Sequence, residues 1–545
     1  MRNMQFVLAL GASVAFTGAA EAKAPSIWVQ CDGYPKPAAS GVKLLRGLAA
    51  VGTLGLSGLP ETFNPEGRET GEAGVTACQS ALAELGGSDN WLRRVTLQQG
   101  LAIHELEAKK PAEALAAVDA AVAAAGENSA NLYFKRSTGV SLDILRGIAL
   151  LQLGRSDEGL ASVRRAAEAR PWSARVKIVA LSMLGIDPIV EPIEFTLAEE
   201  LSRLDPSSVA VPANIYLRGG RYADAWRLYK AHRTAGAEGS DADQPGDQPF
   251  KIPVIKVKSD FSDDLLAAFA AARAGDRKAA DQILEQAISE AKESGTNLAK
   301  FRSETSPEQI ETHQRSFLGN IERWRGMVDA AGLLAAGDAA GAQAKLMDGK
   351  EWPASPLLAD LAADIRAKLP AGERKGLVAI DPAELRAKMG DNRKERLTRL
   401  VGLDLFDILP QPETESRLNG FSKQIGFGLK GTGFKSKMLP NGLTRIEFSG
   451  TVSSPLAVEE MTMLRAAQLA ADAGHKGFKV EKRSDFSRYQ QMTRYGIPEG
   501  PKTLVGFMTR IEVRFADDLS DPAVVNASAL SAALSPIYIR PKSAR

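Results

Sequence analysis

Histidines are the first residues whose spacing could indicate catalysis in this chain of 545 residues. The four histidines are widely spread: His104, His232, His313 and His475. Glu105 follows His104, but no second histidine lies one helical turn further on, as a zinc hydrolase motif requires. No Gly-x-Ser-x-Gly elbow is present to carry a serine nucleophile. We therefore expect no metal, no cofactor and no catalytic residue.

One glycine pattern, at residues 426–431, has the letters G-x-G-x-x-G of a nucleotide-binding loop. That fingerprint needs a hydrophobic strand before it and a helix after it, whose N-terminus points at the phosphates. Pro440 and the pair Asn441-Gly442 follow instead, and they are typical of turns. The pattern is interpreted as strand edges and hairpin turns.

Acidic pairs could supply a general acid and a general base, provided that a cleft raises one of the two pKa values. Glu459-Glu460 and Asp517-Asp518 are instead expected to mark solvated faces. An alternative function stays open, namely an envelope hydrolase with a site between the helical repeats and the C-terminal domain. Its candidate residues are His475, Ser422 and Asp485.

The C-terminal part is more basic than the rest of the chain. From residue 421 onward, 18 Lys and Arg face 11 Asp and Glu, a balance of +7, whereas the whole chain carries +2. This asymmetry favours either contact with an anionic envelope component or a dispersed solubilising charge. Arg465, His475 and Lys476 form the candidate C-terminal patch. A net charge of +2 predicts no nucleic-acid partner.

Helical hairpins must position these residues, and residues 141–171 are the model for them. Apolar residues from Leu142 to Leu153 recur at helical spacing. Gly154 is suited to end the first helix in a left-handed conformation, and Pro171 stops the second. Similar patterns occur at residues 91–125, 173–206, 215–232, 264–291 and 320–347.

The hairpin at residues 141–171 resembles a tetratricopeptide repeat. The matching positions are Gly147, Gly159, Val163, Ala166 and Pro171. Because one hairpin cannot bury its apolar stripe alone, the resemblance implies a stacked α-solenoid. Such an array would bind a protein or peptide partner in its groove. The candidate groove residues are Tyr216, Tyr222, Trp226 and Tyr229, which we expect to be mostly core with some exposure in the groove.

The N-terminus has the pattern of a secretory signal peptide. Arg2 precedes an apolar run and an A-x-A site that ends at Ala22. No later run approaches the ~20 apolar residues of a membrane span. In the oxidising compartment implied by export, Cys31 and Cys78 are expected to form one disulfide. We therefore expect a periplasmic protein with no transmembrane segment in its mature chain.

After residue 420, apolar and polar residues alternate at residues 445–448, 478–481 and 505–515, which is typical of half-buried strands. A helix lies between the first two, with Ser454 as its N-cap. Its apolar stripe is Leu456, Met463, Ala467 and Ala470. One helix against a small sheet predicts an α+β domain.

This domain also resembles a family of small bacterial cell-envelope lipoproteins of unknown function. The motifs that carry the resemblance are Gly420-Phe421-Ser422, residues 446–450, residues 464–469 and residues 474–478. The family usually has Tyr in place of Phe421 and Glu in place of Gln468. The resemblance implies an envelope location and no known chemistry.

The expected fold is mainly α, a tetratricopeptide-like α-solenoid followed by a small α+β domain. The expected segments are a signal peptide at 1–22, an N-terminal disulfide segment at 23–86, helical repeats at 87–370, a linker at 371–419 and the α+β domain at 420–545. The expected function is a non-enzymatic protein-interaction scaffold of the bacterial cell envelope.

Overall fold

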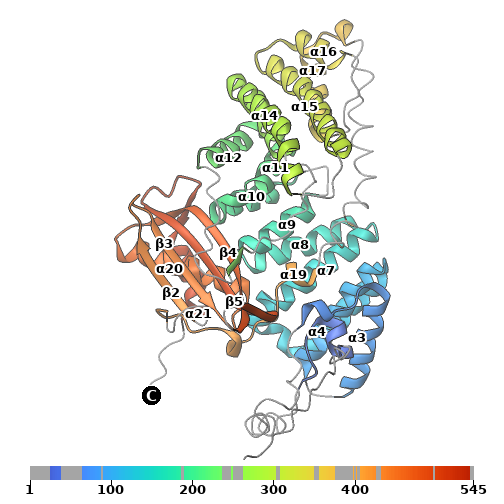
Figure 1. The fold of residues 1–545 in the computed structure, drawn as a ribbon, viewed down its shortest axis with the longest axis vertical. Helices are drawn as coiled ribbons and strands as arrows, with labels where there is room; N and C mark the ends of the chain where they lie inside the picture. Colours follow the sequence, from blue (N-terminus) through green and yellow to red (C-terminus); the bar gives the residue numbers. More distant parts are fainter. Residues whose placement is uncertain are drawn as a thin grey trace, which may run out of the picture.

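A column of helices and a small C-terminal sheet make up the chain (Figure 1). The computed structural model describes residues 25–37, 64–87, 90–185, 190–235, 247–249, 262–301, 307–348, 355–374, 397, 401, 405–424, 431–494 and 497–539. The fold is therefore mainly helical with an antiparallel sheet at its C-terminal end, as the two periodicities predicted. The predicted signal peptide and residues 426–430 of the glycine pattern lie outside the described residues.

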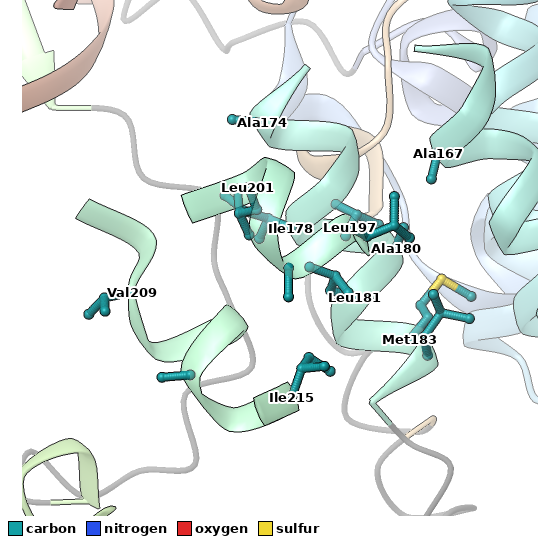
Figure 2. Close-up of a cluster of buried hydrophobic side chains, with 14 of the residues drawn as sticks. Ala167, Ala174, Ile178, Ala180, Leu181, Met183, Leu197, Leu201, Val209 and Ile215 are labelled. Atoms are coloured by element: carbon teal, nitrogen blue, oxygen red, sulfur yellow. The ribbon is translucent and has the colours of Figure 1, made fainter. Parts of the chain in front are cut away.

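From α3 to α17 the column consists of helices that each pack on the next longer helix in the sequence. Its longer helices are α3 Gly71–Leu85, α4 Trp91–Glu107, α5 Pro111–Ala125, α7 Thr138–Gln152, α8 Ser156–Ala169, α9 Ala174–Leu184, α10 Pro192–Leu204, α11 Ala210–Arg218, α12 Tyr222–Ala235, α13 Ser262–Arg273, α14 Arg277–Phe301, α15 Pro307–Ala335, α16 Ala339–Leu346 and α17 Pro356–Lys368. Figure 2 shows apolar side chains from α8 to α11 gathered in the shared core. Burial of these faces stabilises the column by the hydrophobic effect.

Two glycines let α7 and α8 approach closely. A Cβ on Gly147 would lie 2.6 Å from Cγ2 of Val163, and a Cβ on Gly159 would lie 2.8 Å from Cγ of Leu151. Gly154 follows α7 with φ of 79°, the left-handed conformation predicted for it. The small residues of this hairpin therefore serve helix packing and a tight turn.

The predicted disulfide is confirmed. Cys31 in α1 (Ile27–Asp32) is bonded to Cys78 in α3, with their Cα atoms 4.6 Å apart and both side chains buried. His104 on α4 contacts the same segment, because its Nε2 is 2.7 Å from the carbonyl oxygen of Cys31. The N-terminal segment is thus fastened to the first helices of the column.

The sheet has the strand order β1-β4-β5-β3-β2, with β6 also paired to β4, and every pair is antiparallel. Its strands are β1 Asp247–Pro249, β2 Gly433–Met438, β3 Thr444–Gly450, β4 Gly477–Arg494, β5 Ile497–Ala516 and β6 Val524–Asn526. Helices α20 (Pro455–Asp472) and α21 (Ala527–Tyr538) pack together, and α20 covers one face of the sheet.

The described parts of two connections belong to the packed structure. Strand β1, which lies between α12 and α13 in the sequence, pairs with β4 at residues 486–488. In the predicted linker, α19 (Leu405–Ile408) packs on α4, and Leu405, Ile408 and Leu409 are buried. Residues 405–409 of the predicted linker are therefore packed against the column.

Among the described residues, no helix is long and apolar enough to cross a membrane.

The close approach of α7 and α8 predicts an effect of Gly147→Val. The added methyl groups would overlap Val163, and overpacking of this kind costs about 1–3 kcal/mol. We expect a lower melting temperature by circular dichroism. The control is Gly319→Ala in α15, where an added Cβ meets nothing within 4 Å and helix propensity improves by up to about 1 kcal/mol. Equal melting temperatures for the two variants would contradict this account of the hairpin.

Candidate functional site

The helical column and the sheet domain meet along connections between successive helices. The helical residues lie at the end of α6 (Leu132–Arg136), between α8 and α9, and at the end of α10. Figure 1 places the sheet beside this flank of the column. Charged side chains from both parts are buried at this junction, which we call the ionic interface. Buried ionisable groups of this kind mark candidate functional sites.

Glu460 on α20 is the centre of the ionic interface. Its carboxylate accepts hydrogen bonds from Arg136 at 2.7 Å and from Arg170 at 3.0 Å, and it also accepts one from the Tyr538 hydroxyl. The side chains of Glu460 and Arg170 are 0% exposed. Arg170 also donates to the carbonyl oxygen of Arg136 at 2.8 Å. One carboxylate of the C-terminal domain thus ties together two connections of the column.

A second group of charges surrounds Glu459. Its carboxylate accepts from Arg483 on β4 and from the Ser173 hydroxyl, which caps the start of α9. Arg483 also pairs with Asp485 at 3.0 Å, and Arg175 of α9 lies 3.7 Å from Asp485. The N-terminal end of α9 is therefore held directly against β4.

The segment that leads into the C-terminal domain supplies the fourth carboxylate. Glu413 accepts from Arg170 at 3.0 Å and from the Ser454 hydroxyl. Its backbone N–H donates to the Ser137 hydroxyl at 3.0 Å, and the Ser141 hydroxyl donates to the carbonyl oxygen of Pro410 at 2.8 Å. The buried segment thus follows the same helix ends as the domain.

The charges of the ionic interface balance. Four arginines face four carboxylates: Arg136, Arg170, Arg175 and Arg483 against Glu413, Glu459, Glu460 and Asp485. Transfer of such ions out of water is costly unless each is paired, and removal of one partner costs about 3–5 kcal/mol. The balance indicates a structural joint rather than a site for a charged ligand.

The pKa values in the ionic interface are shifted in both directions. Burial raises the pKa of Glu460, but Arg170 and Arg136 lower it below its ordinary value. Burial also raises the pKa of Asp485, but Arg483 and Arg175 lower it below its ordinary value. Burial prevails at Glu459, whose pKa is raised. These opposite shifts show that burial and the neighbouring arginines act against each other at Glu459, Glu460 and Asp485.

The candidate groove residues lie mainly in the core. Tyr216 and Tyr229 are buried, and Tyr216 stacks on Phe195 with ring centroids 5.9 Å apart. Tyr222 lies under the guanidinium of Arg273, 4.2 Å from ring centroid to Cζ. Nε1 of the partly buried Trp226 donates to Asp276 at 3.2 Å. The contacts of Tyr216 and Tyr222 join α10 to α11 and α12 to α13, respectively.

The candidate C-terminal patch is divided between two places. Arg465 lies over the ring of Phe434 at 4.5 Å, on the side of the sheet that α20 covers. His475 and the exposed Lys476 lie in the turn after α20, where His475 is 3.1 Å from Asp517.

The residues of the hydrolase alternative are also separate. Asp485 belongs to the ionic interface, whereas His475 pairs with Asp517 before β4 begins. Eight residues of β4 span roughly 25 Å, so these two side chains do not form a dyad. Ser422 is exposed beside the start of β2. Among the described residues, no group of three or more metal-binding side chains occurs.

A solvent-open cavity of about 380 Å³ lies between α5, α7 and α8. Leu115, Leu150 and Ala161 are the apolar residues of a lining that is otherwise polar or charged. Its three arginines are each paired with a carboxylate, Arg146 with Asp119, Arg155 with Glu158 and Arg165 with Asp143.

The expectation that Glu459 and Glu460 are solvated is wrong, because both face arginines in a closed interface. A signal for both residues was present in the sequence. Glu459 and Glu460 lie three and four residues after Leu456 and four and three residues before Met463, and therefore both border the apolar stripe of their helix. A carboxylate on such a stripe requires a buried partner.

In comparisons with known proteins, no protein-family model, curated protein or solved structure matches the chain. The geometry and chemistry of these residues therefore carry the functional proposals.

Arg170→Met tests the ionic interface. The substitution leaves Glu413 and Glu460 buried with one cation fewer, which is expected to destabilise the docked domain by about 3–5 kcal/mol. Earlier protease cleavage in the segment before the C-terminal domain should report the opening. Arg155→Met removes an exposed arginine and should leave the cleavage rate unchanged. Equal protease resistance of Arg170→Met and the native chain would refute the structural role of the cluster.

The lowered pKa values of Glu460 and Asp485 predict acid opening of the ionic interface. A lowered folded-state pKa gives stability that is present above the unfolded value of about 4 and is lost as the pH falls through the folded value. The raised pKa of Glu459 acts in the opposite sense and offsets part of the change. We expect the radius of gyration from small-angle scattering to stay constant from pH 8 to 5 and to rise below about pH 4. The rise should be smaller in Glu460→Gln, and a rise between pH 8 and 5 would contradict the assignment.

Proposed function

We propose that the chain is an exported, non-enzymatic scaffold of the bacterial cell envelope that acts in the periplasm. In this proposal the helix pairs form a tetratricopeptide-like α-solenoid that binds a peptide or protein partner. The repeated Gly and Ala positions of the hairpins and the serial packing of α3 to α17 support it. The signal-peptide pattern and the Cys31–Cys78 disulfide support export.

The observation that carries the proposal is the division between closed and open surfaces. The ionic interface is sealed by its own charges, so it holds the two parts together and leaves its carboxylates unavailable for hydrolysis. The cavity between α5, α7 and α8 is open and combines apolar side chains with arginines. Binding of a partner segment there needs no catalytic group. The residues of the hydrolase alternative lie apart, so no observation favours that function.

Site-specific photo-crosslinking in the native host tests the proposal. A photoreactive amino acid replaces Ala161 in the cavity or Ala223 on α12, near the candidate groove residues. The control position is the exposed Ala83 on α3. We expect one discrete protein adduct at Ala161 or Ala223, in the periplasmic fraction, and none at Ala83. Adducts of equal yield at all three positions, or recovery of the chain from the cytoplasm, would overturn the proposal.

A further inference from the structure

Two Asn-Gly pairs occur in the sequence, and the fold gives them different surroundings. Asn419-Gly420 follows the segment that carries Glu413 into the ionic interface. Asn441-Gly442 lies in the turn between β2 and β3. Before a glycine, the side-chain amide of asparagine is readily reached by the next backbone nitrogen, because glycine has no side chain to hinder the approach. The two pairs can therefore be compared directly.

The side-chain oxygen of Asn419 lies among four donors in front of α20. Its Oδ1 accepts from the backbone N–H of Thr451 at 2.9 Å and from those of Val452 and Ser453, each at 3.1 Å. The Ser453 hydroxyl donates to the same oxygen at 3.1 Å. Since backbone N–H groups can only face an acceptor, the amide oxygen occupies this position and the amide nitrogen does not. We call these four donors the Asn419 nest.

The Asn419 nest is suited to an oxygen that carries negative charge. Successive backbone N–H groups in a turn form concavities that bind anions. The nest directly precedes Ser454, the N-cap of α20, so the positive end of the helix dipole adds to it. A neutral amide oxygen has two lone pairs for the four donors. The arrangement is that of an oxyanion hole, which stabilises an amide oxygen most when that oxygen becomes charged.

The two glycine nitrogens, which would be the nucleophiles, also differ. The Gly420 N–H donates to no acceptor among the described residues, and Gly420 is exposed, with nothing within 4 Å of an added Cβ. The Gly442 N–H, in contrast, donates to the carbonyl oxygen of Leu439 at 3.0 Å, and Oδ1 of Asn441 accepts from the Leu443 N–H at 3.1 Å. The first pair thus has the more accessible nucleophile and the larger number of donors around the oxygen.

We propose that Asn419 is a site of spontaneous deamidation, with Gly420 as the nucleophile and the Asn419 nest as the oxyanion hole. The Gly420 nitrogen forms a bond to Cγ of Asn419 and gives its proton to solvent, while the carbonyl electron pair moves to Oδ1. When this pair returns, the Cγ–Nδ2 bond breaks, and Nδ2 takes a proton from solvent and leaves as ammonia. One water molecule then opens the cyclic imide at either carbonyl, which leaves an aspartate or an isoaspartate at position 419.

In its aspartate form, the product ties the segment before the C-terminal domain more firmly to α20. Nδ2 of Asn419 makes a long contact of 3.4 Å with the exposed Thr451 hydroxyl, so its loss leaves no buried group without a partner. A carboxylate in the nest forms charge-assisted hydrogen bonds, which are about twice as strong as neutral ones. They would add to the bond between Glu413 and Ser454. The proposal does not depend on partner binding by the column.

Peptide mapping by mass spectrometry of the full-length oxidised protein tests the proposal. The fractions of aspartate and isoaspartate at positions 419 and 441 are followed near neutral pH, in the folded protein and in urea. We expect Asn419 to react about ten-fold faster than Asn441 in the folded protein, because only the first has the oxyanion donors. In urea the two rates should converge, and the rate at Asn419 should fall. Equal rates in the folded protein, or a rate at Asn419 that rises in urea, would overturn the proposal.

Two kinds of variant test the Asn419 nest itself. Ser453→Ala removes one donor and should slow deamidation of Asn419 about two- to ten-fold, as expected for one neutral hydrogen bond, with no change at Asn441. Gly420→Ala should also slow it and keep the melting temperature, because the added methyl group hinders the nucleophile and meets no neighbour. Asn419→Asp should raise the melting temperature, whereas Asn441→Asp, with the same change in net charge, should not. An unchanged rate in Ser453→Ala, or a lower melting temperature for Asn419→Asp, would contradict the proposal.

Discussion

The exclusion of water from eight paired charges is the constraint on which the arrangement of this protein depends. Arg136, Arg170, Arg175 and Arg483 can be buried only where four carboxylates meet them. Those carboxylates come from α20, from β4 and from the segment before the C-terminal domain. A shift of the domain along the column would therefore leave buried charges without partners. Apolar packing alone would define the position less sharply, because it has no direction.

The periodic parts of the fold could be predicted from the sequence because burial repeats there at a fixed spacing. The stripe of the α7–α8 hairpin and the alternation in β3 and β5 each reflect one local geometry. The disulfide could be predicted because the chain has only two cysteines and its N-terminal pattern predicts export. The helices and strands can be predicted from the spacing of neighbouring residues, and the disulfide from the oxidising compartment that the N-terminal pattern predicts.

The ionic interface could not be predicted in the same way, because its partners are distant in sequence. Arg170 and Glu413 are 243 residues apart, and Arg136 and Glu460 are 324 apart. Single charged residues before a proline or within a helix are ordinary in solvated positions. Only Glu459 and Glu460, on the apolar stripe of their helix, carried a local signal of burial. The packed segment at 405–413 was assigned to a linker. Pro410 and Pro412 are typical of irregular structure, and a helix of four residues is too short to show a periodic pattern.

The central claim is that the column and the C-terminal domain form one rigid unit through the ionic interface. Spin labels at the exposed positions of Asp157→Cys on α8 and Ala532→Cys on α21, with the native disulfide intact, measure it directly by double electron–electron resonance. The account predicts one narrow distance distribution in the otherwise native chain and a broad one when Arg170→Met is added. A distribution that is already broad before Arg170 is replaced would contradict it.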